Sequence, residues 1–313
     1  MTPWPDVPRQ LELPSPVGAK SGTSGNGGPI DREQAAQEID LLFRRALRGE
    51  GGHGLSELIR FMLRFRRYSV WNAAMIRIQR LGAAAVATAR KWERAGRSVN
   101  PDAIPIVILR PFGPISLVYE IADTSPPIQN QEGYDPFPVE GAVSEAVWTD
   151  TVSNALKKDA IVVELVDYGL LQPGSAIRLM TNQGGETVAG DGNTRFRVRI
   201  AKNLTLPQRY TTLAHELAHI YCGHLGSGKK DWWPNRKDHL TAGQEELEAE
   251  ATAFIVAGRA GLDLASDEYL ADHVHSNDLD AISIDAVIRA AARIEALERQ
   301  GIREAIWKPT MAS

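Results

Sequence analysis

Five consecutive residues, His215-Glu216-Leu217-Ala218-His219, constrain this chain more than any other feature. In an α-helix of 3.6 residues per turn, positions 215 and 219 lie about 40° apart, so both imidazoles reach one zinc ion. Glu216 lies beside them, where its carboxylate is placed to act as a general base on water that the ion activates. The pattern predicts a helix that carries a metal centre.

The residues around this motif favour a helix. Thr205 is suited to be the N-cap, Pro207 lies in the first turn, and Gln208 occupies the reciprocal capping-box position. Residues 210–221 contain no Gly or Pro and keep leucine and isoleucine at helical spacing. The competing interpretation is a surface helix in which the spacing arose by chance.

Residues 195–200, just before this helix, alternate arginine with Phe196, Val198 and Ile200. The alternation predicts a half-buried strand, and the outward arginines indicate an edge strand. An exposed strand beside the metal helix could pair with an extended peptide, so a peptide is the substrate that this arrangement suggests.

A third metal ligand has to come from outside residues 215–219. The extended metzincin motif would need Gly at position 222 and His at position 225, where this chain has Cys222 and Leu225. His224 would lie about 140° from His219 if the helix continued, so it is expected to point away.

Residues 244–254 are strong helix formers and include four glutamates. Glu246 and Glu250 lie one turn apart on one face, whereas Glu248 points about 160° from either. In a Glu-zincin arrangement one carboxylate binds zinc, and a residue four positions later hydrogen-bonds a ligand histidine. We therefore predict Glu246 as the third ligand and Glu250 as its supporting catalytic partner. The reverse assignment and a merely solvated acidic face remain alternatives.

Length and composition limit the class of protein. At 313 residues the chain exceeds the usual single-domain size, which predicts two domains. Cys222 is the only cysteine, so an intrachain disulfide is excluded and a reducing compartment is favoured. No apolar run reaches the roughly eighteen residues of a membrane span, and residues 1–29 are rich in Pro, Gly and Ser. We expect a cytoplasmic protein with a disordered leader and no membrane partner.

The net charge of −4 conceals an uneven distribution. Residues 41–100 contain thirteen basic and three acidic residues, a balance of +10, so the remainder carries −14. Tyr68, Trp71 and Trp92 lie among these arginines, a mixture that single-stranded nucleic acid sites use for phosphate contacts and base stacking. Solvated helix faces, aromatic core anchors and an acidic protein partner are the competing interpretations.

Residues 65–76, Phe-Arg-Arg-Tyr-Ser-Val-Trp-Asn-Ala-Ala-Met-Ile, followed by Gln79, residues 87–92 and Gly96-Arg97, resemble the N-terminal domain of ArdC-type antirestriction proteins. The resemblance extends through residues 106–109 and 118–124. Members of this family join a single-stranded-DNA-binding domain to a zincin domain. The resemblance implies nucleic-acid contacts by Arg66, Arg67, Tyr68, Trp71, Asn72, Gln79, Lys91, Trp92 and Arg97.

The C-terminal half resembles ImmA/IrrE-type metallopeptidases. Residues 215–219 match their HExxH motif, and Glu246-Leu247-Glu248-Ala249 with Phe254 resembles their second acidic helix. Two departures matter. Residues 99–105 replace the Lys/Gly-rich turn of ArdC-type proteins, so several expected phosphate-binding lysines are missing. Position 250 is Glu where the ImmA/IrrE-type pattern favours Asn or Asp.

The patterns along the chain predict an α+β protein of two domains. We expect a leader over 1–29, a basic domain over 30–125, a proline-rich linker over 126–139 and a zincin-like domain over 140–313. Helices are expected over 30–49, 55–81, 83–97, 142–157 and 282–300, a strand over 161–166 and a Gly-rich loop over 184–194.

The motifs and the resemblance together predict a zinc-dependent metallopeptidase with a single-stranded-DNA-binding N-terminal domain, acting in antirestriction or in a mobile element. Zn²⁺ is the expected metal, with Mn²⁺ as an alternative, and a protein or peptide is the expected substrate. The alternative function is a DNA-binding antirestriction or regulatory protein whose metal only stabilises the fold.

Overall fold

The computed structural model describes residues 40–41, 43–44, 54–110, 113–126, 143–167, 173–179, 194–228, 231–262 and 282–298. Helices and strands are both present, which confirms the predicted α+β class. The predicted leader, most of the helix over 30–49, and nearly all of the linker over 126–139 and the loop over 184–194 lie outside the described residues.

Two helices, α2 (Gly54–Arg64) and α3 (Val70–Gln79), replace the single helix predicted over 55–81. Ser69 caps α3 by accepting a hydrogen bond from the Asn72 backbone N–H at 3.2 Å. At the end of α2, the freed Met62 carbonyl accepts a hydrogen bond of 2.6 Å from the Arg259 guanidinium. The single-helix prediction is wrong because a side chain far along the chain supplies partners that local sequence does not reveal.

Short strands and one short helix follow α3. They are β1 (Val86–Ala87), α4 (Ala89–Arg94), β2 (Ser98–Val99), β3 (Ile106–Arg110), β4 (Gly113–Glu120), η1 (Ile121–Asp123) and β5 (Thr124–Ser125). One antiparallel sheet has the order β1-β4-β3, and β2 pairs with β5. The helix predicted over 83–97 is shorter than expected because Val86 and Ala87 pair with β4 instead.

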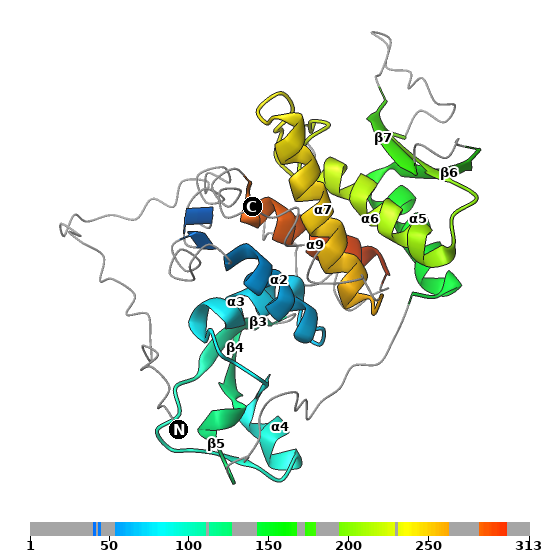
Figure 1. Ribbon diagram of the computed structural model, residues 1–313. Helices are drawn as coiled ribbons and strands as arrows, with labels where there is room; N and C mark the ends of the chain where they lie inside the picture. The colour runs from blue at the N-terminus through cyan, green and yellow to red at the C-terminus, as the bar shows by residue number, and fades with distance from the viewer. Residues whose placement is uncertain are drawn as a thin grey trace, which may run out of the picture.

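The C-terminal part has the elements α5 (Glu145–Asp159), β6 (Ile161–Val166), β7 (Gly174–Arg178), β8 (Phe196–Ala201), α6 (Leu206–Tyr221), α7 (Ala242–Arg259) and α9 (Ile284–Glu298). The strand predicted over 161–166 is confirmed, and α5 and α9 match the helices predicted over 142–157 and 282–300 within three residues at each end. β3 and β4 lie at one end of the molecule and β6 and β7 at the other, with α7 and α9 between them (Figure 1).

β8 is the middle strand of its sheet, parallel to β6 and antiparallel to β7. The edge-strand prediction for residues 195–200 is therefore wrong, although the alternation is confirmed because Phe196, Val198 and Ile200 are buried. The outward arginines fit a central strand because Glu164 of β6 lies beside them, 3.3 Å from both Arg197 Nε and Arg199 Nε.

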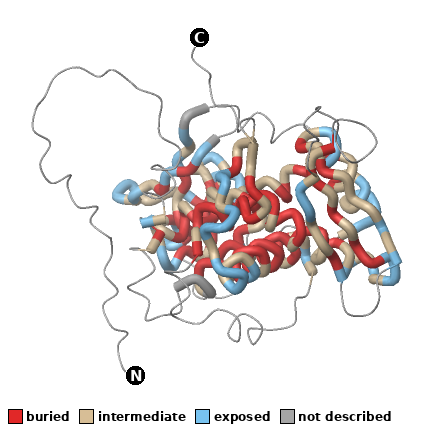
Figure 2. Tube along the Cα trace, turned by 90° about the horizontal axis from the view of Figure 1, so that it is seen from above, coloured by how far each residue is buried: buried red, intermediate tan, exposed pale blue. Residues whose placement is uncertain are grey.

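One hydrophobic cluster connects the helices of the two predicted domains. It includes Leu58 of α2, Ile76 of α3, Leu217 of α6, Ile255 of α7 and Ile288 of α9, all fully buried. The buried segments concentrate in the middle of the molecule (Figure 2).

The predicted domain boundaries stay a prediction. Among the described helices, none has the length and apolar character to cross a membrane.

Candidate metal centre

The helix α6 carries the histidine pair and begins where the sequence predicts. It starts at Leu206 after Thr205, whose backbone N–H donates to the Gln208 side-chain oxygen at 3.0 Å. Leu213, Leu217 and Ile220 are buried, so one face of α6 is fixed against the core. This anchoring sets the direction in which the two histidines project.

Potential ligand atoms of three side chains converge between α6 and α7. His215 Nε2 lies 3.1 Å from His219 Nε2 and 3.3 Å from Glu246 Oε2, and His219 Nε2 lies 3.5 Å from Glu246 Oε1. Tetrahedral zinc with ligand bonds of about 2.0–2.1 Å separates neighbouring ligand atoms by about 3.3–3.4 Å. The donor types and their spacing therefore fit one zinc ion.

The centre is open on the side of Glu246. Its side chain is 58% exposed, whereas the His215 and His219 side chains are 25% and 14% exposed. A structural zinc site usually has four protein ligands and no room for another group. A catalytic zinc site usually has three protein ligands and leaves the fourth position for water or substrate. Among the described residues, only these three side chains meet at this point, which leaves such a position.

Glu216 is buried and lies against β7. A Cβ placed on Gly174 would be only 2.8 Å from Glu216 Oε1, so the absence of a side chain at Gly174 makes room for this carboxylate. Burial, and then the charge of Glu246, raise the pKa of Glu216 to about 7. A carboxyl group with a pKa near neutrality is suited both to accept and to return a proton.

His219 is held in its neutral form. Burial, followed by the proximity of His215 and His224, lowers the pKa of His219 to about 3. A neutral imidazole is the form that binds a metal, so the environment favours ligation near neutral pH.

Glu250 makes no hydrogen bond or ion pair with another described residue, and the structure does not bring it to either histidine. Its supporting role stays a prediction. The structure places a different residue against the ligands, because His224 Nδ1 lies 3.0 Å from His219 Nδ1. His224 in turn contacts Glu248, with 2.9 Å between Nε2 and Oε2.

Sequence reasoning missed His224 because it assumed that the helix continues. α6 ends at Tyr221, and Gly223 adopts a φ of +88°, which turns the chain back. A glycine just past a helix end is the signal that could have located His224, since such a turn brings the next residue back onto the last turn of the helix.

Several residues that the ArdC resemblance implies for DNA binding are engaged inside the protein. Trp92 is 0% exposed, and its indole N–H donates to the Tyr119 carbonyl at 2.9 Å. This burial leaves no ring face for a base to stack on. Arg97 is also buried, with its Nε–H donating to Thr124 Oγ1 at 2.7 Å.

The segment 66–68 donates to main-chain carbonyls. Arg66 Nε–H donates to the Arg259 carbonyl at 2.6 Å. Arg67 Nη2–H and the Tyr68 hydroxyl both donate to the Val86 carbonyl, at 2.5 and 2.8 Å. These contacts fix the α2–α3 turn to its surroundings.

Asn72 and Gln79 cover the outer edge of β3. Asn72 Oδ1 accepts a hydrogen bond from the Leu109 N–H, and Asn72 Nδ2–H donates one to the Leu109 carbonyl, both at 3.0 Å. Gln79 makes the same pair of bonds with Val107, at 2.8 and 2.9 Å. The two amides thus replace a neighbouring strand along this edge.

The two remaining residues of that set, Trp71 and Lys91, are half-buried. Trp71 packs edge-on against Phe43, with 6.3 Å between the ring centroids. The contact of these nine residues with nucleic acid stays a prediction.

Residues 176–272 match the family model of the IrrE N-terminal-like domain, Peptidase_M78. The match covers the histidine pair, Glu216 and Glu246, and it confirms the resemblance to ImmA/IrrE-type proteins. Two solved structures of the antirestriction protein ArdC from the R388 plasmid are also similar to this chain. The Mn(II)-bound structure is 17% identical, with 74% of this chain and 86% of that chain covered and a TM-score of 0.35. The metal-free structure is 17% identical, with 74% and 82% covered and a TM-score of 0.32. No curated protein matches this chain.

Proposed function

We propose that this protein is a metal-dependent peptidase, with His215, His219 and Glu246 as zinc ligands. The convergence of their ligand atoms at 3.1–3.5 Å beside the buried Glu216 carries this proposal. A divalent ion held there would polarise a substrate carbonyl and acidify a water molecule. Mn²⁺ can use the same imidazole and carboxylate donors, but two histidines and one carboxylate suit zinc.

Glu216 supplies the proton transfer. Its carboxylate accepts a proton from the attacking water and later returns it to the nitrogen of the leaving amine. Burial favours the protonated form between these steps, since the pKa of Glu216 is raised to about 7 mainly by desolvation. A purely structural metal would not need a proton carrier at this position, which favours the catalytic proposal over the structural alternative.

The strand β7 offers a place for a peptide. Among the described strands, β7 pairs only with β8 and therefore lies at the edge of its sheet, and its Gly174 lies against Glu216. An extended peptide could add to this edge through main-chain hydrogen bonds and present a peptide bond to Glu216. We therefore move the peptide-pairing proposal from residues 195–200 to β7.

Metal content and peptide cleavage of matched variants test this proposal. Glu246→Ala should lose zinc, whereas Glu216→Gln should keep zinc by elemental analysis and lose cleavage of a mixed peptide library by several orders of magnitude. Zinc-loaded Glu216→Gln that cleaves at the parental rate would refute the role of Glu216. A zinc-loaded parent that cleaves nothing in the library would support the structural alternative.

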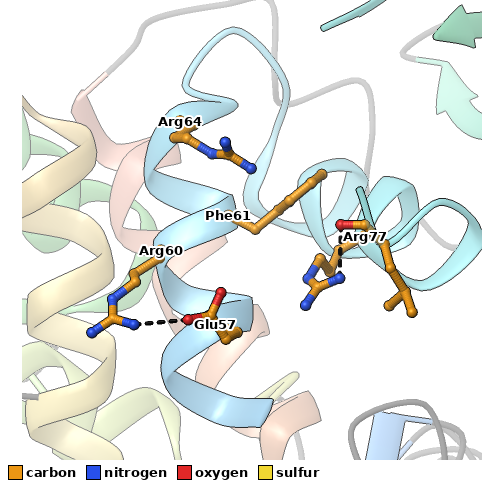
Figure 3. Close-up of a pocket in the computed structure, with 6 residues that line it drawn as sticks. Glu57, Arg60, Phe61, Arg64 and Arg77 are labelled. Carbon is orange, nitrogen blue, oxygen red and sulfur yellow. Dashed lines mark hydrogen bonds and ion pairs between the residues drawn. The ribbon is translucent and has the colours of Figure 1, made fainter. Parts of the chain in front are cut away.

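We further propose that the basic N-terminal part binds single-stranded DNA, and an arginine-lined pocket favours this second function. A cavity of about 270 Å³ between α2 and α3 is lined by Glu57, Arg60, Phe61, Arg64, Arg77 and Leu81 (Figure 3). Three arginines and one glutamate give it a balance of +2. Such a site suits a phosphate of the DNA backbone.

Within this pocket the arginines differ in how firmly they are held. Arg60 Nη1 pairs with Glu57 at 2.8 Å, and Arg77 Nη1–H donates to the Leu81 carbonyl at 2.8 Å. The Arg64 guanidinium lies 5.5 Å from the centroid of the Phe61 ring and makes no hydrogen bond or ion pair with another described residue. Arg64 is therefore the arginine most available for a phosphate.

Fluorescence anisotropy of the full chain with a labelled oligonucleotide, measured across a salt series, tests DNA binding. Arg64→Gln should weaken binding and reduce the slope of log K against log salt by about 0.7, the value for one phosphate contact on a single strand. Arg90→Gln removes an equal charge from the exposed face of α4 and serves as the control. No anisotropy change at low salt, or equal slopes for both variants, would contradict the pocket assignment.

A further inference from the structure

The end of α6 is a Schellman turn that returns the chain to the metal centre. The Gly223 N–H donates to the Ile220 carbonyl at 3.1 Å, and the His224 N–H donates to the His219 carbonyl at 3.0 Å. In this turn the residue two positions after the C-cap, which is Cys222 here, contacts the residue three positions before the C-cap. Those two positions are His224 and His219, so the backbone itself sets one imidazole beside the other.

Glycine is required at the turn. The φ of +88° at Gly223 is costly for other residues, and an added Cβ would lie 2.2 Å from the Pro234 carbonyl oxygen. The Gly223 carbonyl also accepts a hydrogen bond of 3.0 Å from the Arg236 N–H. The segment around Arg236 therefore stabilises the turn through contacts with Gly223.

Glu248 holds the far side of His224. Its carboxylate oxygens lie 2.5 and 2.7 Å from the Arg236 guanidinium nitrogens, and Oε1 also accepts the Ser283 N–H at 2.7 Å. The His224 and Glu248 side chains are 1% and 0% exposed, so water does not compete for these bonds.

These contacts determine where the protons lie. The Arg236 guanidinium and the Ser283 N–H already donate to the Glu248 carboxylate, which also accepts the His224 Nε2–H across the 2.9 Å contact. With a single proton on His224, at Nε2, its Nδ1 carries a lone pair, and the 3.0 Å contact then requires His219 to donate its Nδ1–H. His219 is left with a lone pair on Nε2, the atom that faces His215 and Glu246.

We propose that His224 is a positioning residue that, held by Glu248 and Arg236, fixes the tautomer and the direction of the metal ligand His219. This inference rests on the metal site proposed above. It assigns to the pair His224–Glu248 the supporting role that the sequence suggested for Glu250.

A second metal ion at the neighbouring group Cys222, His224 and Glu248 is a poorer interpretation of the same residues. Their ligand atoms lie within 4.8 Å of one another, and all three side chains are buried. However, Arg236 already neutralises Glu248, and burial followed by the Glu248 charge raises the pKa of the Cys222 thiol well above its usual value. A protonated thiol and an arginine-paired carboxylate are unsuited to bind a cation.

Zinc-competition titration of the full chain tests the inference. His224→Leu removes the Nδ1 acceptor that faces His219 and changes the side-chain volume little. It should weaken zinc affinity by about 10- to 100-fold, the usual effect of losing the hydrogen-bond partner of a ligand histidine. His224→Gln keeps one donor and one acceptor and should restore most of that affinity. His239→Leu, at an exposed histidine outside the site, is the control.

The outcomes separate this inference from the proposed metal site. A parent protein that binds no zinc would refute the metal site itself. A parent that binds zinc, with His224→Leu binding as tightly, would overturn the positioning role alone. If His224→Leu does not fold by circular dichroism, nitrogen NMR of the metal-free parent decides, because His219 must be the Nδ1–H tautomer, and the Nε2–H tautomer would overturn the inference.

Discussion

Arg259, near the end of α7, should contribute more to stability than any surface charge, because it joins α7 to both α9 and the α2–α3 turn. Its Nε lies 2.5 Å from Glu295 Oε1, and Nη1 and Nη2 donate to the Met62 and Tyr68 carbonyls, both at 2.6 Å. Only 5% of Arg259 is exposed. Arg259→Met removes the guanidinium but keeps much of the aliphatic volume, so it isolates the polar contacts.

Arg259→Met is expected to lower the free energy of unfolding by a large amount. Removing one partner of a buried ion pair costs about 3–5 kcal/mol, because the other charge stays buried without compensation. The two carbonyls also lose their charged donor, which places the effect toward the upper part of that range. A loss of this size would consume a large share of the roughly 5–15 kcal/mol by which a folded protein is typically stable.

Urea unfolding followed by tryptophan fluorescence and circular dichroism measures this loss. Lys202→Met is the matched control, because Lys202 pairs with Asp167 at 2.7 Å with side chains 56% and 79% exposed, where an ion pair contributes about 0–1 kcal/mol. The double variant Arg259→Met/Glu295→Leu should recover part of the stability, since it also removes the buried carboxylate that Arg259→Met leaves without a partner. If Arg259→Met loses no more than the Lys202 control, the importance assigned to these contacts is wrong.

Three further changes have defined outcomes. Gly174→Ala places a Cβ 2.8 Å from Glu216 Oε1 and should lower peptide cleavage while zinc content, measured by elemental analysis, stays parental; loss of zinc instead would contradict the separation of these roles. Asn72→Ala removes both bonds to the edge of β3 and should lower the free energy of unfolding by about 1–3 kcal/mol, where an unchanged urea midpoint would argue against an edge-covering role. Trp92→Ala should cost about 3–5 kcal/mol of stability, yet leave DNA affinity of the folded fraction unchanged in anisotropy titrations, because its ring is buried.

Local patterns predicted α6 well, because its determinants are close neighbours in sequence. A capping residue, a proline in the first turn and apolar residues at helical spacing act within a few residues of one another, and the helix runs from Leu206 to Tyr221 as these signals indicate. The same holds for β6, whose bounds match the predicted range 161–166. Helical geometry predicted that His215 and His219 share a face and that Glu246 and Glu250 share another, and the Glu-zincin arrangement favoured Glu246 as the third ligand.

The predictions that failed depended on partners distant in the chain. The break between α2 and α3 depends on Arg259, which lies 197 residues beyond Met62. The central place of β8 depends on β6 and β7, because outward arginines suit any strand whose neighbour supplies a carboxylate such as Glu164.

The residue types and their spacing predicted a metal site, since two histidines four apart on a helix and a carboxylate on a second helix suffice to suggest a metal. Only the tertiary structure decided which side chains lie against those histidines. The turn at Gly223 stops α6 and brings His224 to His219, and Glu248, which helical geometry had turned away from the metal-facing side of α7, holds His224 in place. Orientation requires atoms from three separate segments to meet within hydrogen-bond distance, and only the packing of α6 against α7 and α9 brings those segments together.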